Sequence, residues 1–209
     1  MSLLKYERKL YKSGINLIAG VDEVGRGPLV GPLVSAAVIL PKNYKLKGLT
    51  DSKKLSENKR NAFYKIIMKD AISVSTSIIS EKIIDEVNIY EATKLAMIEA
   101  INNLSVKPEH VLIDAMKLSI DIPSTSIIKG DTISLSIAAS SVIAKVTRDN
   151  IMKELDKKYP MYGFASHKGY ATKKHIENIK KYGVLENYRF TFKPVCDLIG
   201  NEKQKKVLK

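Results

Sequence analysis

The clustering of apolar residues along the chain predicts five strands. Short apolar runs bounded by Gly, Pro or charged residues are typical of buried strands, and runs that alternate with polar residues are typical of half-buried ones. Such runs occupy residues 16–22, 33–40, 71–79, 110–114 and 125–129.

Longer segments carry apolar residues at three- and four-residue spacing, which predicts helices. Ser56 is a candidate N-cap for the first of them, and Pro160 and Gly183 are stop signals for two later ones. The predicted helices cover about 56–68, 90–104, 133–159 and 172–182. Strands come first and then mix with helices, so we expect an α/β protein with a sheet of mixed strand directions and a helical C-terminal part.

The organisation of the chain predicts one domain. No internal repeat, low-complexity linker or Pro/Gly/Ser-rich break interrupts the 209 residues. We therefore expect a single catalytic domain over residues 1–200, followed by a basic, disordered tail over 201–209.

Composition limits the cellular setting. Hydrophobic residues make up 44% of the chain, yet no run is long enough for a membrane span or a secretory signal. Cys196 is the single cysteine, so no intramolecular disulfide is possible. These features predict a soluble, cytoplasmic protein without membrane attachment, and we expect a monomer.

The charge balance favours a polyanionic partner. Lys and Arg number 35 against 22 Asp and Glu, which gives a net charge of +13. Such a surface attracts nucleic acid first. The alternative is a lysine-rich chain without any nucleic-acid role.

Carboxylates follow two of the predicted strands. Asp22 and Glu23 end the first, and Asp114 directly follows the apolar run of 111–113. Strand ends are favoured ligand positions in α/β folds. Each carboxylate could instead be a solvated strand end or a cap. The Gly25-Arg26-Gly27 loop beside the first pair favours a site, because glycines let the backbone approach a ligand closely.

A fourth carboxylate could come from Asp131 or Asp149. Asp131 could cap the helix that starts at Thr132. The two acids are 149 − 131 = 18 residues apart, or roughly 27 Å along one helix, so they cannot share one metal site. We favour Asp131, at the helix start, and expect Asp149 to form a surface salt bridge near Arg148.

Histidine and cysteine offer no competing chemistry. The chain has no Cys/His zinc spacing, and Cys196 is expected to be a small packed residue. His167 is expected either near the substrate or in support of the backbone, and His175 is expected to face solvent.

Several motifs follow one another in order from about residue 16 to 196. The first is Ala19–Pro32, which reads AGVDEVGRGPLVGP. The others lie at 51–56, 111–114, 129–131, 136–149, 162–164, 167–170 and 189–195. Together these motifs resemble the signature of ribonuclease HII.

The resemblance implies a ribonuclease H-like fold and an endonuclease that hydrolyses the RNA strand of RNA–DNA hybrids. Cleavage would include the 5′ side of single ribonucleotides embedded in duplex DNA, leaving 5′-phosphate and 3′-hydroxyl ends. It also implies two Mn²⁺ or Mg²⁺ ions held by three Asp and one Glu, a set that hard cations prefer. Carried over by position, the catalytic and metal-binding residues are Asp22, Glu23, Asp114 and Asp131.

The same resemblance implies how the substrate is held. The Gly25-Arg26-Gly27 loop would read the ribonucleotide 2′-hydroxyl, and Tyr170 would pack on the neighbouring sugar. Lys53 and Lys168, inside matched motifs, are candidates for phosphate contact.

The chain departs from the family pattern at two positions. Ala115 stands where the family usually has Gly, and Ser140 where many members have Ala. Ala115 would be strained only if its position needs a positive φ angle.

Three other readings compete. A non-catalytic hybrid-binding module would not need all four acids. Ribonuclease HIII carries an extra N-terminal substrate-binding domain, whereas about 15 residues precede the first predicted strand here. An integrase-like enzyme of the same fold class would lack the Gly25-Arg26-Gly27 loop.

Overall fold

The computed structural model describes residues 3–50 and 52–200, and the predicted tail at 201–209 lies outside them. Internal contacts divide the chain into two compact units. The first comprises the residues up to Val24, Val34–Ile78 and Thr93–Thr147; the second comprises Gly25–Leu33, Ile79–Ala92 and the residues from Arg148 onward. The expectation of a single domain over 1–200 remains a prediction.

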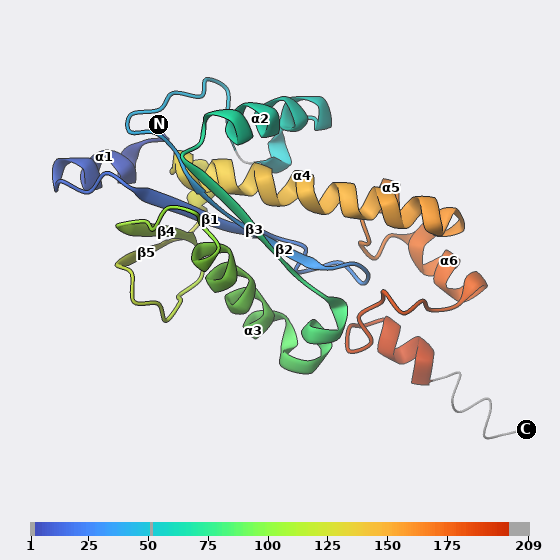
Figure 1. Ribbon diagram of the computed structural model, residues 1–209. Helices are drawn as coiled ribbons and strands as arrows, with labels where there is room; N and C mark the ends of the chain where they lie inside the picture. Colours follow the sequence, from blue (N-terminus) through green and yellow to red (C-terminus); the bar gives the residue numbers. More distant parts are fainter. Residues whose placement is uncertain (1–2, 51, 201–209) are drawn as a thin grey trace, which may run out of the picture. The chain divides into compact units, whose positions relative to one another are not determined.

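The first unit is built around a five-stranded sheet with the order β3-β2-β1-β4-β5 (Figure 1). The strands are β1 (Ile18–Val24), β2 (Leu33–Ile39), β3 (Ser73–Ile79), β4 (His110–Asp114) and β5 (Ser124–Ile127). β2 is antiparallel to β1, whereas β4 is parallel to β1 and β5 is parallel to β4. The predicted mixed five-stranded sheet is therefore confirmed.

Alternate residues of the central strands pack on opposite faces of the sheet. Ala19 and Val21 contact a cluster that includes Met97 of α3 (Glu81–Asn102). Ile18 belongs to a different cluster, with Ile137 of α4 (Leu135–Lys158). In Figure 1, the part of α3 from Thr93 covers one face of the sheet, and the part of α4 up to Thr147 covers the other together with α2 (Glu57–Asp70).

The start of α4 is anchored by two residues from the N-terminal part of the first unit, Gly20 and Glu7. A Cβ atom at Gly20 would lie 2.0 Å from the Ser136 carbonyl carbon, so only glycine lets α4 approach β1 this closely. Glu7 of α1 (Lys5–Lys12), a helix absent from the sequence prediction, is fully buried. Its Oε1 accepts hydrogen bonds from Ser134 Oγ at 2.7 Å and Ser136 N at 3.0 Å. The Glu7 carboxylate thus satisfies the Ser136 amide, one of those that the helix start leaves open.

The second unit contains the short helices η3 (Pro160–Tyr162) and α5 (Phe164–His167), then α6 (Lys173–Tyr182). Thr172 caps α6 by accepting from His175 N, and Gly183, with a φ of 86°, follows its last turn. The predicted helix at 172–182 is thus confirmed. The aromatic rings of Tyr162 and Phe164 stack at 5.2 Å in the core of this unit.

α3 begins nine residues before the predicted start at about residue 90, since it starts at Glu81 (90 − 81 = 9). A break at Asn88, with φ 70° and ψ 164°, divides it. The Asn88 side chain accepts from Tyr90 N and Glu91 N, so it caps a new helical segment. The apolar periodicity identified that second segment only.

Candidate active site

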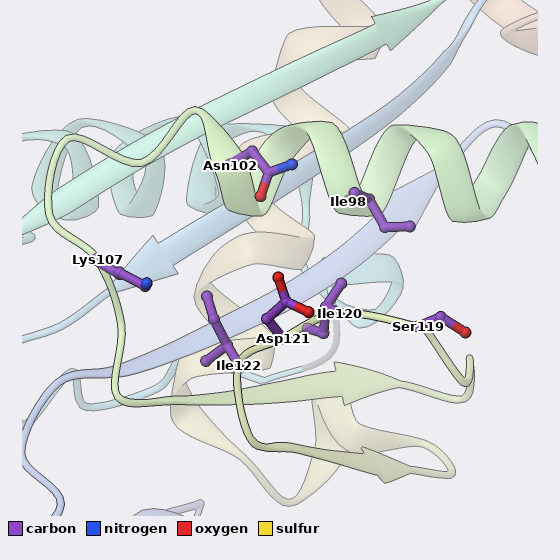
Figure 2. Close-up of a pocket in the computed structure, with 7 residues that line it drawn as sticks. All are labelled: Ile98, Asn102, Lys107, Ser119, Ile120, Asp121 and Ile122. Carbon is purple, nitrogen blue, oxygen red and sulfur yellow. The ribbon is translucent and has the colours of Figure 1, made fainter.

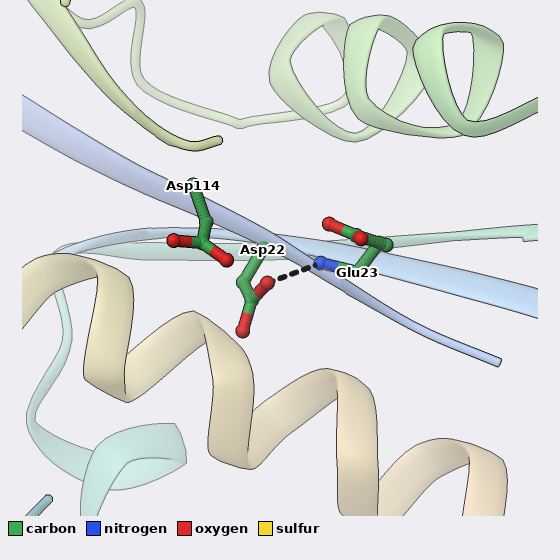
Figure 3. Close-up of side chains that lie close together, drawn as sticks. All are labelled: Asp22, Glu23 and Asp114. Atoms are coloured by element: carbon green, nitrogen blue, oxygen red, sulfur yellow. Dashed lines mark hydrogen bonds between the residues drawn. The ribbon is translucent and has the colours of Figure 1, made fainter. Parts of the chain in front are cut away.

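The register of the parallel strands brings two acids together. Pairing of β1 with β4 runs from Ile18 opposite His110 to Val21 opposite Ile113, so Asp22 and Asp114 are next in line. Carboxylate oxygens of Asp22, Glu23 and Asp114 all lie within 4.8 Å of one another. Figure 3 shows the three side chains converging at this end of the sheet.

Backbone amides orient two of these carboxylates. Asp22 Oδ1 accepts from Glu23 N at 2.7 Å (Figure 3), and Asp114 Oδ1 accepts from Gly130 N at 2.7 Å. A Cβ atom at Gly130 would lie 2.5 Å from Ile137 Cδ1 and 3.3 Å from Asp114 Oδ1, so a larger residue would disturb this contact.

Like charges concentrate at Asp22. Burial raises the pKa of Asp22 well above its usual range, and the carboxylates of Glu23 and Asp114 raise it further, against a lowering by the Ser141 hydroxyl. A hard divalent cation, which prefers carboxylate oxygens, would relieve this repulsion. The three residues therefore fit a divalent metal by donor type and by spacing.

Asp131 is placed differently from the other three acids. It lies in η2 (Gly130–Thr132), is 7% exposed, and is not a member of the three-carboxylate group. Its chain neighbour Gly130 is the residue that donates to Asp114. The assignment of Asp131 as a fourth ligand stays a prediction.

Two expectations about polar residues were wrong. Asp149 lies inside α4 as expected, but it is 4% exposed and so is not a surface residue. His175 is fully buried instead of facing solvent. Its Nδ1 is 2.8 Å from the Tyr170 carbonyl oxygen and its Nε2 is 2.8 Å from the Tyr188 hydroxyl. Burial is the main cause that lowers the pKa of His175 to about 4, so the ring is neutral at pH 7.

Ala115 has the positive φ angle at which alanine is strained. Its φ is 51°, directly after Asp114, and its amide donates to the Ile127 carbonyl at 3.0 Å. A left-handed conformation costs a non-glycine residue about 1–2 kcal/mol. The departure from the family's Gly therefore stores strain next to an acid of the site.

The predicted substrate residues lie mainly in the second unit. Arg26 and Gly27 are exposed in the loop that begins at Gly25, whose φ is 104°. A Cβ atom at Gly27 would lie 3.5 Å from Tyr170 Cε1, so the Tyr170 ring borders this loop. Tyr170 is 49% exposed. Lys168 has a left-handed backbone at the end of α5. Lys53, in contrast, is exposed in η1 (Ser52–Lys54) of the first unit.

Sequence reasoning missed two buried arginines in the second unit. Arg148 and Arg189 are 1% and 0% exposed. Charged side chains are rarely buried this completely, and no local pattern distinguishes these two from the many exposed basic residues. Both guanidinium groups donate hydrogen bonds to backbone carbonyls of the same unit.

A cavity of about 250 Å³ lies elsewhere in the first unit, between the end of α3 and the loop before β5 (Figure 2). None of the predicted site residues lines it. Its lining consists of Ile98, Asn102, Lys107, Ser119, Ile120, Asp121 and Ile122.

Comparison with known proteins identifies the family. The family model described as "Ribonuclease HII" matches residues 19–195, most of the chain. The chain belongs to the ribonuclease HII family. A ribonuclease HII from Bacillus cytotoxicus is 59% identical over 202 residues, covering 97% of this chain and 78% of the relative. One from Bacillus thuringiensis is 58% identical over 199 residues, covering 95% and 77%.

Solved structures agree with this membership. The ribonuclease H2 of Pyrococcus horikoshii has a TM-score of 0.77 at 26% identity, covering 89% of this chain and 98% of that one. An Archaeoglobus fulgidus RNase HII, solved in complex with PCNA, has a TM-score of 0.73 at 28% identity, covering 85% and 95%. The predicted ribonuclease H-like fold is thus confirmed.

Family membership establishes the class of reaction. Ribonuclease HII enzymes are divalent-metal-dependent endonucleases that cleave the RNA strand of RNA–DNA hybrids, and this chain is a hydrolase of that type. No helix within the described ranges is long and apolar enough to cross a membrane.

Proposed function

We propose that this ribonuclease HII cuts on the 5′ side of ribonucleotides, including single ones embedded in duplex DNA, and leaves 5′-phosphate and 3′-hydroxyl ends. The observation that carries the metal-dependent cleavage is the convergence of Asp22, Glu23 and Asp114 within 4.8 Å. Repair of such ribonucleotides would be its cellular task.

In this proposal Asp22, Glu23 and Asp114 hold two Mn²⁺ or Mg²⁺ ions, with Asp131 as a fourth ligand. Such ions, when bound, supply a Lewis acid that activates water and stabilises the leaving 3′ oxygen. Asp22 must lose its proton to act as a ligand, and the Glu23 amide helps by donating to its Oδ1 at 2.7 Å. The Gly130 amide keeps Asp114 turned toward the same point.

Recognition of the ribonucleotide is assigned to the second unit. A scissile phosphate is the same in DNA and RNA, so discrimination needs a contact with the 2′-hydroxyl, which both donates and accepts hydrogen bonds. Gly25, Arg26 and Gly27 supply backbone groups and a cation for this purpose. Tyr170 offers a half-exposed ring to the neighbouring deoxyribose, where a hydroxyl would obstruct close packing.

Arg26, Lys53 and Lys168 are assigned to phosphate contacts. Each phosphate neutralised by a cation releases counterions, so affinity falls as salt rises. Binding of a hybrid to the protein without divalent metal should therefore weaken steeply between 50 and 200 mM salt, by about tenfold or more. A flat salt dependence, measured by fluorescence anisotropy, would exclude these contacts.

We further propose that the enzyme acts as a cytoplasmic monomer. The high net charge of +13 and the lack of a cysteine pair support this setting. Sedimentation of the purified protein would test the oligomeric state, and a dimer at micromolar concentration would contradict it.

The proposed reaction is tested by cleavage of a duplex with one embedded ribonucleotide, beside an all-DNA duplex of the same sequence. We expect a single cut on the 5′ side of the ribonucleotide with Mn²⁺ or Mg²⁺, and none in the all-DNA control. Cleavage of long hybrids only, with the single-ribonucleotide duplex intact, would exclude the proposed specificity.

A further inference from the structure

Two cations are buried in the second unit beside the loop that carries Gly25 and Arg26. Arg189 Nη2 donates to the carbonyls of Gly25 at 2.6 Å and Gly31 at 2.8 Å, and its Nη1 donates to that of Arg26 at 3.0 Å. One planar guanidinium thus joins both ends of the loop.

Arg148 joins the same loop to the Tyr170 segment. Its Nε donates to the Pro32 carbonyl at 2.9 Å and its Nη2 to that of Val30 at 3.1 Å. Its Nη1 donates to the Lys168 carbonyl at 3.0 Å. A backbone hydrogen bond from Leu29 N to the Gly169 carbonyl, at 2.8 Å, reinforces this link.

Placing these charges here is costly. Burial lowers the pKa of both arginines, and Arg148 further lowers that of Arg189, to about 9. Glu81 and Asp85 offset part of the repulsion. Buried charges often destabilise a fold relative to apolar residues of similar size, so stability alone does not explain these two arginines.

The conformation of the loop offers an explanation. It contains three glycines and is free to adopt many backbone conformations unless something fixes it. Carbonyls that accept from buried guanidinium groups are turned into the protein, while the Arg26 side chain and Gly27 remain exposed.

We propose that Arg189 and Arg148 are positioning residues that hold the Gly25–Pro32 loop and the Tyr170 segment as one rigid platform, and so determine how well the enzyme recognises a ribonucleotide in DNA. This inference rests on the proposed function. Arg189 sets the shape of the loop, and Arg148 sets the distance between the loop and Tyr170.

The experiment replaces each arginine by lysine, which keeps the charge and removes the planar fork. Displacement of a positioning group by about 1 Å costs up to 10²-fold in rate. We expect Arg189→Lys to lower kcat/KM on a single-ribonucleotide duplex by about 10–100-fold. Arg148→Lys should lower kcat/KM on the single-ribonucleotide duplex more than on an all-RNA hybrid, because the substitution loosens the Tyr170 segment. Mn²⁺ affinity, measured by calorimetry, should stay within about twofold of wild type in both.

The matched control is Tyr162→Phe in the same unit. It removes hydrogen bonds to the carbonyls of Tyr182 at 3.1 Å and Gly183 at 3.0 Å without touching the loop. This variant should lower the melting temperature and leave the ratio of the two substrates unchanged.

Wild-type kcat/KM on the single-ribonucleotide duplex in both folded lysine variants would overturn the proposal. An equal loss of kcat/KM in the Tyr162→Phe control would overturn it as well. Failure of both lysine variants to fold would also overturn it, because the arginines would then serve stability alone. Failure of the proposed function is distinguishable, because the wild-type enzyme itself would then leave the single-ribonucleotide duplex uncut.

Discussion

Like charges meet in both units of this protein, but the two groups of charges differ in their surroundings. In the first unit Asp22 is surrounded by Glu23 and Asp114, whose charges raise its pKa. In the second unit Arg148 and Arg189 are satisfied by carbonyls of their own chain. The acids offer oxygen ligands to a cation from solution, whereas the arginines already donate hydrogen bonds to carbonyls of the protein. The first arrangement is therefore suited to binding a cofactor, and the second to fixing a loop.

The largest effect is expected when one charge is removed from the acid cluster. Asp22→Asn or Asp114→Asn keeps the shape of the side chain but deletes a ligand charge, so we expect cleavage to fall by about 10³-fold or more. The metal-free variants should be as stable as wild type or more stable, because repulsion is relieved. Turnover and thermal melting of the purified proteins measure both effects.

Asp121→Asn is the matched control, since it removes an exposed carboxylate of the same unit. It should keep full activity. Wild-type turnover in either Asp22→Asn or Asp114→Asn would contradict the assignment of the cluster.

The second unit is probed at Tyr170. Loss of one stacking contact is worth roughly 1–3 kcal/mol, so Tyr170→Ala should lower turnover at RNA–DNA junctions by about one to two orders of magnitude. An all-RNA hybrid should be affected less. Tyr90→Ala, which removes another exposed tyrosine (47%), is the control. Equal junction cleavage by Tyr170→Ala and wild type would remove Tyr170 from the site.

Acid should destabilise the second unit through His175. Its pKa is about 4 in the folded protein against 6.5 for the free side chain, so the unfolded chain binds more protons between these values. The free energy of unfolding is then highest above pH 6.5 and falls as pH drops toward 4.

Denaturant titrations at several pH values test this dependence. His175→Phe should be less stable at neutral pH, because two hydrogen bonds are lost, but its stability should depend less on pH. His167 keeps part of the dependence, since burial lowers its pKa as well. An unchanged pH slope in the variant would contradict the role of His175.

The smallest effect is expected at Ala115. Glycine adopts its φ of 51° without strain, although it loses more entropy on folding, so Ala115→Gly should stabilise the protein by about 0.5–1 kcal/mol. The control is Ala62→Gly in the exposed surface of α2, where glycine should destabilise by about 1 kcal/mol. Equal losses of melting temperature in both variants would show that Ala115 is unstrained.

The local sequence pattern was sufficient to predict many of the strands and helix ends. The strand at 110–114 was predicted at its observed bounds, because three apolar residues end at one acid. Ser56, Thr172 and Gly183 marked helix ends by chemistry that acts within a few residues. The register of β1 with β4, which brings Asp22 to Asp114, could be expected only from strand ends and from the family resemblance.

The wrong predictions concern helices and buried polar residues whose placement is determined by tertiary contacts. α1 was missed because its apolar residues are few, and its buried Glu7 is explained only by the start of α4, which lies 127 residues away. His175 looks like a surface residue of a polar helix and Asp149 like a surface partner of Arg148, yet both are buried. Arg148 and Arg189 bond to carbonyls between 20 and 164 residues away along the chain, and no sequence window reveals such partners.

The effect of Mn²⁺ on the melting temperature of the metal-free protein tests directly whether the three carboxylates bind metal. Binding to the folded state alone raises stability with ligand concentration. If Asp22, Glu23 and Asp114 form the metal site, wild type should show a rising melting temperature as Mn²⁺ increases, and Asp22→Asn should show a much smaller rise. Equal rises in the two proteins would mean that the ions bind elsewhere and would exclude these three carboxylates as the metal site.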